Sequence, residues 1–478
     1  MDVDFRIQRI SDVLHSRPLN LLFVLLLYHI YCCTSVDTES LQGKLIFGYQ
    51  GWFQTNQSPQ GWRHWSQGQP TQDSVTFDLW PAVEEFPEES LSDDTDLHDK
   101  ATGEKMKLYD ALQVTDVHFQ WMQRYEIHGV ALQRFLGEIS TDPDLKRRID
   151  DVMLSVKSSA EKYDRAFFIE YDISGANPNT WVDDLLSDWD HIQDLGVTSS
   201  PAYQKNENKL VIKVYGMGFT SFEGTPDQCL RVIDTLKEKS YYFVGAVPTH
   251  WRTGDGDSQS GYDNVYAAMD VISPWLVGRY GNQEEFENYF KGVAMPDIQL
   301  TSSRSQGFVP TVFPGFSWTN LQRNYGSEAD LNAIPRNGGQ FWEMQINSFF
   351  NDLVDPDTGT HAFYVMGAMF DEFDEGTAMA KAASTVDDIP AEGTFLYLSI
   401  DGEEIPSDFY LLLAQKYSYD FINSPSHTKY SSVIHNNRTI HRDVVEVLKK
   451  KAYQVEVARS RRYSKENSTA HYPSTVTK

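Results

Sequence analysis

Cysteine is scarce in this sequence, with three residues in 478, and two of them, Cys32 and Cys33, lie within the first 35 positions. If that segment is removed, Cys229 alone remains and no intrachain disulfide can form. Disulfide-stapled extracellular scaffolds are thereby excluded. A chain of this length can instead be stabilised by burying apolar surface, since 40% of its residues are hydrophobic and 13% are aromatic.

Basic residues are also few. The chain has 41 Lys and Arg against 68 Asp and Glu, which gives a formal net charge of -27. Nucleic-acid binding depends on clustered cationic side chains that neutralise phosphates, and the body of this chain has the opposite bias. Nucleic acid is therefore excluded as a partner, and a neutral or cationic ligand is expected.

Near the N-terminus, an apolar run covers only residues 19–31, which is shorter than the roughly 20 residues of a comfortable membrane span. Three arginines precede it and small residues follow at 33–35. This order predicts that residues 1–35 are a signal peptide and that the protein is secreted. The alternative is an uncleaved signal anchor, with residues 19–31 in the membrane and the body in the Golgi lumen. Either way, sequons at Asn56, Asn437 and Asn467 predict a glycoprotein.

Short apolar runs of strand length alternate with longer stretches of helical periodicity from residue 43 onward. Such alternation is typical of βα units around a parallel sheet, whose strands are apolar on both faces. Eight runs of this kind predict a (β/α)8 TIM-type barrel over residues 36–422. The runs are 45–49, 129–135, 166–171, 210–215, 242–247, 271–276, 308–313 and 363–370.

Two stretches fall outside the repeat. Residues 54–105 form a long acidic insertion after the first strand, and a loop of that length is usually functional or disordered. Residues 423–478 form a basic C-terminal extension, with 11 Lys and Arg against 4 Asp and Glu from position 429 onward. Its polar composition predicts a mostly mobile appendage.

Four carboxylates stand directly after the last predicted strand, at Asp371, Glu372, Asp374 and Glu375. Crowded carboxylates raise one another's pKa values, so one carboxyl can keep its proton while a neighbour is ionised. Glycosidic cleavage needs that division between a proton donor and a base or nucleophile. The alternatives are a solvated acidic loop or a calcium site.

Aromatic and polar side chains gather at the predicted strand ends, where barrel enzymes bind their substrates. Aromatic faces stack well on sugar rings, although core packing is the alternative for each ring. The candidate substrate-binding residues of this kind are Tyr49, Trp52, His64, Trp65, Trp251 and Trp275.

The order of motifs resembles glycoside hydrolase family 99, the endo-α-mannosidases, and the wider set of family 71/99-like proteins. The family has Tyr-x-x-Trp-Tyr followed by Arg-His-Trp, and its catalytic stretch is Phe-Asn-Glu-Trp-His-Glu-Gly. Sequences similar to its Pro-x-x-x-Pro-Gly-Tyr and Arg-x-x-Gly-Gln motifs are also present in this chain. The resemblance extends from about residue 43 to residue 422. The matching stretches here are 49–53, 63–65, 370–376, 310–316 and 336–340.

This resemblance implies a retaining glycoside hydrolase that acts on an α-mannan or related polysaccharide or glycan. By the resemblance, Glu372 is the general base that assists attack by the sugar 2-hydroxyl, and Glu375 is the general acid/base. The reaction passes through a 1,2-anhydro sugar, and neither a metal nor another cofactor is implied.

The resemblance also implies a substrate-binding carboxylate at Glu170 or Asp172, between which the sequence does not choose. Tyr215, Arg134 and Arg336 are further candidates for the pocket rim, with structural hydrogen bonds or ion pairs as the alternative role.

The chain departs from the family pattern at three positions of the catalytic stretch: Asp371 replaces Asn, Phe373 replaces Trp and Asp374 replaces His. These changes alter the charge around the catalytic pair, so the substrate can differ from the family's. A non-catalytic lumenal protein that binds carbohydrate or calcium is the alternative, because a fold alone does not establish activity. A metal-dependent phosphodiesterase is disfavoured, since His residues do not gather at strand ends. The sequence sets neither the linkage cleaved nor the oligomeric state.

Overall fold

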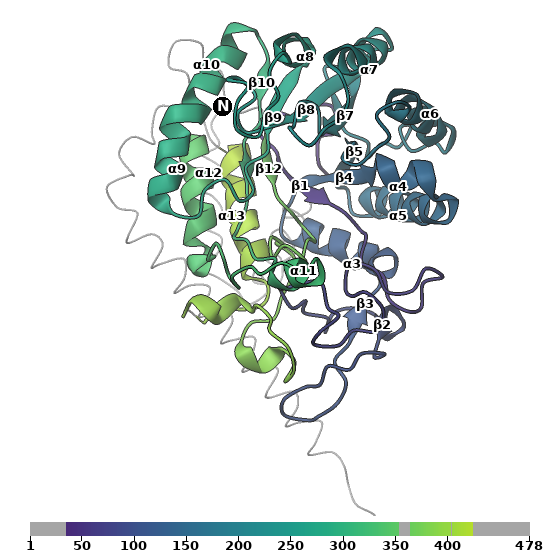
Figure 1. The fold of residues 1–478 in the computed structure, drawn as a ribbon, viewed down its shortest axis with the longest axis vertical. Coiled ribbons are helices and arrows are strands. Elements are labelled where there is room, and N and C mark those ends of the chain that lie inside the picture. Colours follow the sequence, from purple (N-terminus) through teal and green to yellow (C-terminus); the bar gives the residue numbers. More distant parts are fainter. Residues whose placement is uncertain (1–34, 353–363, 403, 424–478) are drawn as a thin grey trace, which may run out of the picture.

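The strands along the main path of the central sheet are parallel and follow the order of the chain around a ring (Figure 1). The computed structural model describes residues 35–352, 364–402 and 404–423. Strands β1, β4, β5, β7, β8 and β9 pair one with the next in that order, and β12 pairs with β1. Their bounds are Leu45–Tyr49, Gly129–Phe135, Ala166–Asp172, Lys209–Tyr215, Tyr242–Val247, Val271–Pro274 and Val365–Gly367.

One divided strand closes the ring. Its first half, β10 (Gly307–Phe308), pairs with β9, and its second half, β11 (Thr311–Val312), pairs with β12. Between the halves stands Pro310, which has no N–H to donate to a ladder. The eight predicted runs therefore form the eight strands of a (β/α)8 barrel, and the predicted fold is confirmed.

Helices surround the sheet and cover its outer face (Figure 1). Two of them begin at N-cap residues: Asp142 caps α5, and Thr225 forms a capping box with Gln228 at the start of α7. The helices are α3 Ala111–Arg124, α4 Leu136–Thr141, α5 Pro143–Lys162, α6 Trp181–Asp194, α7 Pro226–Glu238, α8 Asp263–Ala268, α9 Gln283–Tyr289, α10 Met295–Ser303, α11 Thr319–Asn324, α12 Gln340–Asp352 and α13 Phe409–Asn423. The described chain also contains three two-residue strands: β2 Leu91–Ser92, β3 Leu108–Tyr109 and β6 Lys205–Asn206.

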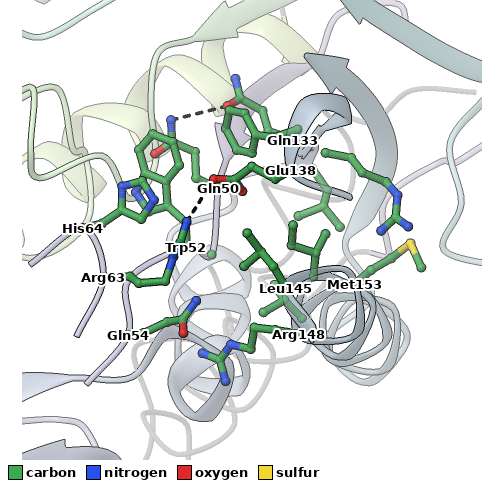
Figure 2. A pocket seen from close by; sticks show the side chains of 16 residues that line it. Gln50, Trp52, Gln54, Arg63, His64, Gln133, Glu138, Leu145, Arg148 and Met153 are labelled. Atoms are coloured by element: carbon green, nitrogen blue, oxygen red, sulfur yellow. Dashed lines mark hydrogen bonds and ion pairs between the residues drawn. The ribbon is translucent and has the colours of Figure 1, made fainter. Parts of the chain in front are cut away.

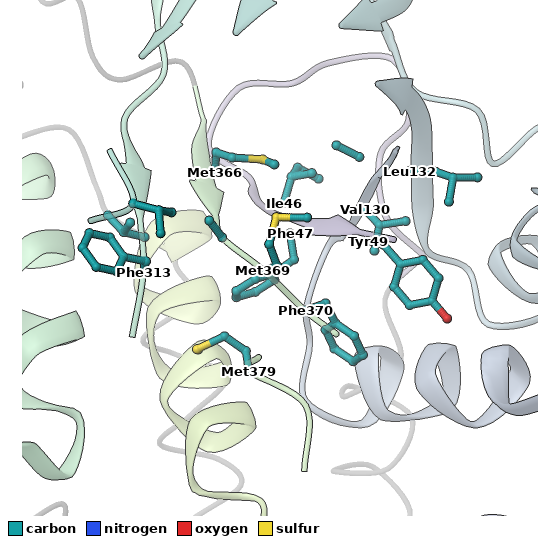
Figure 3. Packing of buried hydrophobic residues seen from close by; sticks show 14 of the residues in the cluster. Ile46, Phe47, Tyr49, Val130, Leu132, Phe313, Met366, Met369, Phe370 and Met379 are labelled. Atoms are coloured by element: carbon teal, nitrogen blue, oxygen red, sulfur yellow. The ribbon is translucent and has the colours of Figure 1, made fainter. Parts of the chain in front are cut away.

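The core where β1 meets β12 shows how closely the strands pack. Phe47, Met366 and Phe370 are fully buried there (Figure 3). A Cβ atom added to Gly367 would lie 2.2 Å from the ring of Phe47, so only glycine fits at this point of β12. This packing fixes the start of the acidic loop, which follows β12 directly.

The acidic insertion after β1 is packed onto the barrel rather than projecting from it. Trp65, Phe77 and Trp80 from this segment are buried, and the side chain of Asp78 accepts hydrogen bonds from Ser317 and from the backbone of α11. The insertion therefore forms part of the wall around the carboxyl end of the barrel.

Several sequence-based predictions fall on other parts of the chain. The predicted targeting segment up to residue 34, the extension from residue 424, and the sequons at Asn437 and Asn467 lie outside the described residues. Asn56 is described and exposed. Among the described residues, no helix is both long enough and apolar enough to cross a bilayer.

Candidate active site

The acidic loop begins at the carboxyl end of β12 and is tied to the loop that follows β1. Asp371 is fully buried, and its two carboxylate oxygens accept the backbone N–H groups of Gln50 and Gly51 at 2.9 and 2.8 Å. Since β1 and β12 are neighbouring strands, this pair of hydrogen bonds holds the first and last loops of the barrel together at its mouth.

Glu372 is anchored through both oxygens of its carboxyl group. Gln50 donates from Nε2 to Oε1 at 2.8 Å, and Thr377 donates from Oγ1 to Oε2 at 2.9 Å. The side chain of Gln50 also lies 3.4 Å from Gln133, which extends the network onto β4. These donors favour the ionised form of Glu372 and fix its orientation.

Glu375 differs from Glu372 because its carboxyl group is partly exposed and makes no hydrogen bond within the described part of the chain. Its backbone is held firmly, since the N–H of Ser317 donates to its carbonyl oxygen at 2.9 Å. The next residue, Gly376, has φ +63°, and a Cβ there would lie 3.2 Å from the nitrogen of Ser317. A glycine at this turn therefore lets the loop pass close to Ser317.

Burial raises the pKa values of all four carboxyl groups in this loop. The pKa of Asp371 rises to about 7 through burial and through Asp374, although the Gln50 and Gly51 N–H groups act against the rise. Burial and the neighbouring charge of Asp374 likewise raise the pKa of Glu372. The pKa of Glu375 is raised well above its ordinary value by burial and by Glu372 and Asp374. The loop can thus hold protons at neutral pH.

Trp52 is enclosed by two aromatic neighbours, contrary to the expectation that a face would be open to sugar. The rings of Trp52 and His64 stack with their centroids 3.9 Å apart, and Phe135 stacks on Trp52 at 5.1 Å. His64 in turn places Nδ1 3.4 Å from a carboxyl oxygen of Asp374. Because burial lowers the pKa of His64 to about 3, this contact joins an uncharged imidazole to the acidic loop.

A pocket adjoins this stack, between the loop after β1 and helix α5 (Figure 2). Gln50, Trp52 and His64 line it together with Leu145 and Arg148 of α5. Neither Glu372 nor Glu375 contributes to its wall, so the pocket lies beside the acidic loop rather than around it.

Three other aromatic candidates are core residues instead of surface ones. Tyr49 and Trp65 are fully buried, and Trp251 is 2% exposed. Their polar atoms are directed to protein partners: the Tyr49 hydroxyl lies 3.0 Å from His118, and the Trp65 indole donates to the carbonyl of Tyr109. These rings support the loops from below, because residues that follow a strand can turn inward as well as toward the mouth.

Tyr215 and Trp275, by contrast, are only partly buried at the ends of β7 and β9. Their rings meet edge to face at 5.4 Å. Burial raises the pKa of Tyr215, with Asp172 and Glu375 adding to the rise and Arg279 opposing it. The phenol therefore lies within electrostatic reach of the acidic loop.

The two candidate carboxylates on β5 occupy different depths. Glu170 is fully buried and pairs with Lys213 of β7 at 3.0 Å. Asp172 lies two residues further along the same face, at the strand end, where it is partly exposed and accepts the N–H of Ser174 at 2.7 Å. Burial raises the pKa of Asp172 to about 6.

The two candidate arginines have structural partners. Arg134 points away from the barrel interior and is fully buried between Asp188 and Asp150 at 2.5 and 2.7 Å. Arg336 lies behind the acidic loop, where it donates to the carbonyl oxygens of Gly376 and Ala378 at 2.8 and 2.7 Å. Both were candidates for the pocket rim, with structural bonding as the alternative. Arg134 borders the pocket beside α5, but the contacts of both arginines hold backbone or helices in place.

Sequence reasoning did not single out Gln50, Thr377 or Lys213. Gln50 stands inside a quoted motif, at a position without a fixed residue type, and no periodicity distinguishes it. Among the described residues, no group of three or more His, Cys, Asp or Glu side chains is arranged to hold a metal ion.

No family model matches the sequence, and a search of curated proteins finds no match. Two solved structures of a family 99 endo-α-mannosidase from Bacteroides thetaiotaomicron are similar in fold. One, in complex with bis-tris propane, has a TM-score of 0.55 at 14% identity and covers 80% of this chain and 99% of that chain. The other has a TM-score of 0.56 at 14% identity and covers 81% and 100%. The chain thus shares the (β/α)8 fold of these endo-α-mannosidases.

Proposed function

We propose that this chain is a retaining glycoside hydrolase that acts on an α-mannan or a related polysaccharide or glycan. Glu372 is the general base and Glu375 the general acid/base. The observation that carries the proposal is the arrangement of these two carboxyls on one turn at the carboxyl end of the barrel. One is anchored by two donors, and the other is free to meet a ligand.

The different surroundings of the two carboxyls support different roles. The first proton leaves the group whose anion is best stabilised, which is Glu372 with its bonds to Gln50 and Thr377. The negative charge formed there then raises the pKa of Glu375. Over the pH range between these two steps the pair holds one proton, so one group can act as a base and the other as an acid.

The steps follow the route that the family resemblance implies. Glu372 accepts the proton of the sugar 2-hydroxyl while that oxygen bonds to the anomeric carbon. Glu375 donates its proton to the leaving oxygen as the glycosidic bond breaks. Water then opens the 1,2-anhydro ring, with Glu375 taking its proton and Glu372 returning one to the 2-oxygen, so configuration is retained after two inversions.

Asp172 is the carboxylate at the barrel mouth that supports substrate binding. Glu170 lies deeper and its charge is already paired with Lys213, whereas Asp172 stands at the strand end beside Tyr215. The partly exposed Tyr215 and Trp275 add an aromatic surface for a sugar ring on the same side.

The test begins with the purified secreted portion, from residue 36 onward, on a panel of mannans, glucans and sulfated polysaccharides. On the substrate found, Glu375→Gln should lower turnover at least about a hundredfold, while activated aryl glycosides suffer less because their leaving groups need little protonation. Glu372→Gln should slow both substrate types alike, and 2-deoxy or 2-fluoro substrates should be inert even to the unmutated enzyme.

Glu161→Gln serves as the matched control, since Glu161 lies on α5 outside the barrel and pairs with Lys157 and Ser200. It should leave turnover unchanged. If both catalytic-loop amides hydrolysed the substrate at the unmutated rate, the assignment would be wrong. Sugar binding without hydrolysis by the unmutated chain would indicate the non-catalytic alternative.

We also propose that the enzyme works in the secretory pathway, as a secreted protein or as a Golgi protein anchored through residues 19–31. The N-terminal segment and an exposed sequon at Asn56 support this location. Expression in a eukaryotic cell followed by glycosidase treatment should shift the mobility of the protein. An unglycosylated cytosolic product with residues 1–35 intact would contradict the proposal.

A further inference from the structure

A second polar cluster lies on the loops that follow β8 and β9, and Asp257 is its centre. One carboxylate oxygen of Asp257 accepts the N–H of Thr249 at 3.0 Å and contacts Nη2 of Arg279 at 2.9 Å. The other accepts the N–H of His250 at 3.1 Å and lies 2.9 Å from Nδ1 of the same ring. Asp257 therefore fixes one imidazole and one guanidinium side by side.

The polar edges of both side chains remain open to a ligand. Because Nδ1 of His250 faces Asp257, Nε2 points away from it, and Arg279 uses only one of its nitrogens in the ion pair. The side chains of His250 and Arg279 are 40% and 37% exposed, whereas that of Asp257 is 13% exposed. The turn at Gly256 closes tightly over the imidazole, since a Cβ there would lie 2.8 Å from Nδ1.

The cluster belongs to the same mouth as the acidic loop. Thr249 donates from its hydroxyl to the carbonyl of Trp275 at 2.7 Å, and Trp275 meets Tyr215 edge to face. The charge of Glu375 raises the pKa of Tyr215, and the charge of Arg279 lowers it, so both side chains lie near the Tyr215 hydroxyl. Arg279 therefore lies near Tyr215, as Glu375 does, and the residue before His250 contacts Trp275.

The exposure of these donors distinguishes the cluster from the buried ion pairs of the chain. The Arg134 network shows how the chain builds a structural ion pair: the guanidinium is 1% exposed and contacts two carboxylates. Around Asp257 the carboxylate is sheltered and the donors face outward. Since Asp257 offsets the charge of Arg279, the pair offers directed hydrogen-bond donors and an acceptor rather than net positive charge.

We propose that His250 and Arg279 form a sugar-binding subsite next to the cleavage point, which takes the hydroxyl groups of a neutral sugar unit adjoining the one cleaved. This inference rests on the proposed glycosidase function. Adjacent sugar hydroxyls match the paired donors of a guanidinium and the free Nε2 of an imidazole, while the Trp275 ring supplies an apolar face.

The test compares two substrates of the same sugar: an oligosaccharide and an activated aryl glycoside that carries a single ring. Arg279→Gln and His250→Asn should each lower kcat/KM for the oligosaccharide about tenfold, mainly through a higher KM. Turnover of the aryl glycoside should not change. His250→Gln, which can place an amide near the position of Nε2, should lose less than His250→Asn, which can only reach Asp257.

The matched control is Arg231→Gln, because Arg231 forms a similar exposed pair with Asp183 on the outer helices. It should leave both substrates unaffected. Equal losses on both substrates, or no loss on the oligosaccharide, would overturn the subsite. A wild-type chain that hydrolysed neither substrate and bound no oligosaccharide would refute the proposed function, and the subsite with it. Wild-type hydrolysis with unchanged variants would refute the subsite alone.

Discussion

Lys213 and Glu170 form a buried ion pair, and breaking this pair should destabilise the fold. The two charges lie 3.0 Å apart, and both side chains are at most 1% exposed. At an effective dielectric constant of about 20, their attraction is about 5.5 kcal/mol. Lys213→Met would leave Glu170 buried without its partner, and breaking such a pair typically costs about 3–5 kcal/mol.

The loss should depend on pH in a defined direction. Burial already raises the pKa of Glu170, and Lys213 opposes that rise, so removing Lys213 raises the pKa further. In the folded variant Glu170 keeps its proton, whereas in the unfolded chain Glu170 loses it above about pH 4.5. The stability of the variant therefore falls as the pH rises above about 4.5. The cost of Lys213→Met should therefore be larger at pH 8 than at pH 5.

Urea unfolding followed by tryptophan fluorescence measures the free energy of unfolding for each variant at both pH values. The double variant Glu170→Leu, Lys213→Met should recover most of the loss, because two apolar side chains leave no buried charge. As a control, Lys239→Met removes an exposed pair with Asp190 and should cost under about 1 kcal/mol. A cost below about 1 kcal/mol for Lys213→Met at pH 8 would show that this buried pair does not stabilise the fold as expected.

Two more predictions concern the acidic loop. Because burial raises the pKa values of its carboxyls, the folded chain binds more protons than the unfolded chain, and the melting temperature should fall as pH increases from about 4 to about 8. Asp374→Asn should flatten that slope in calorimetry, and parallel curves for the variant and the parent would contradict the prediction. Gly376→Ala should cost about 1–3 kcal/mol from its φ of +63° and displace the loop from Ser317, lowering activity. Gly61→Ala, at φ +73° with no atom within 4 Å, should carry the backbone cost alone, and equal activities for the two variants would show that the Ser317 contact is unimportant.

The strands could be predicted from the sequence because a parallel barrel buries each of them on both faces. The predicted runs at 45–49, 129–135 and 242–247 coincide with β1, β4 and β8. Because both faces of each strand are buried, the sequence pattern does not indicate which side chains face the barrel interior. Gln133 turns toward Gln50 and the acidic loop, while Arg134 next to it turns outward to Asp188, and both lie in the same predicted strand.

For aromatic residues at strand ends, the sequence does not indicate whether the ring is exposed at the barrel mouth or buried. The sequence placed Trp65, Trp251 and Trp275 after strands, which is where the structure has them. Whether a ring then lies on the mouth or beneath it depends on the path of the following loop. Trp275 remains partly exposed, whereas Trp65 and Trp251 fill space under the loops.

The barrel and the acidic loop at the end of its last strand could be predicted from the sequence. These features depend on residues that are neighbours in the chain. The groups that surround Glu372 and Glu375 could not be predicted, because they come from distant segments of the chain. Gln50 reaches Glu372 across 322 positions of the sequence, and Asp371 holds the loop after β1 from a similar distance. Closing the barrel brings its first and last strands together, and that contact builds the site.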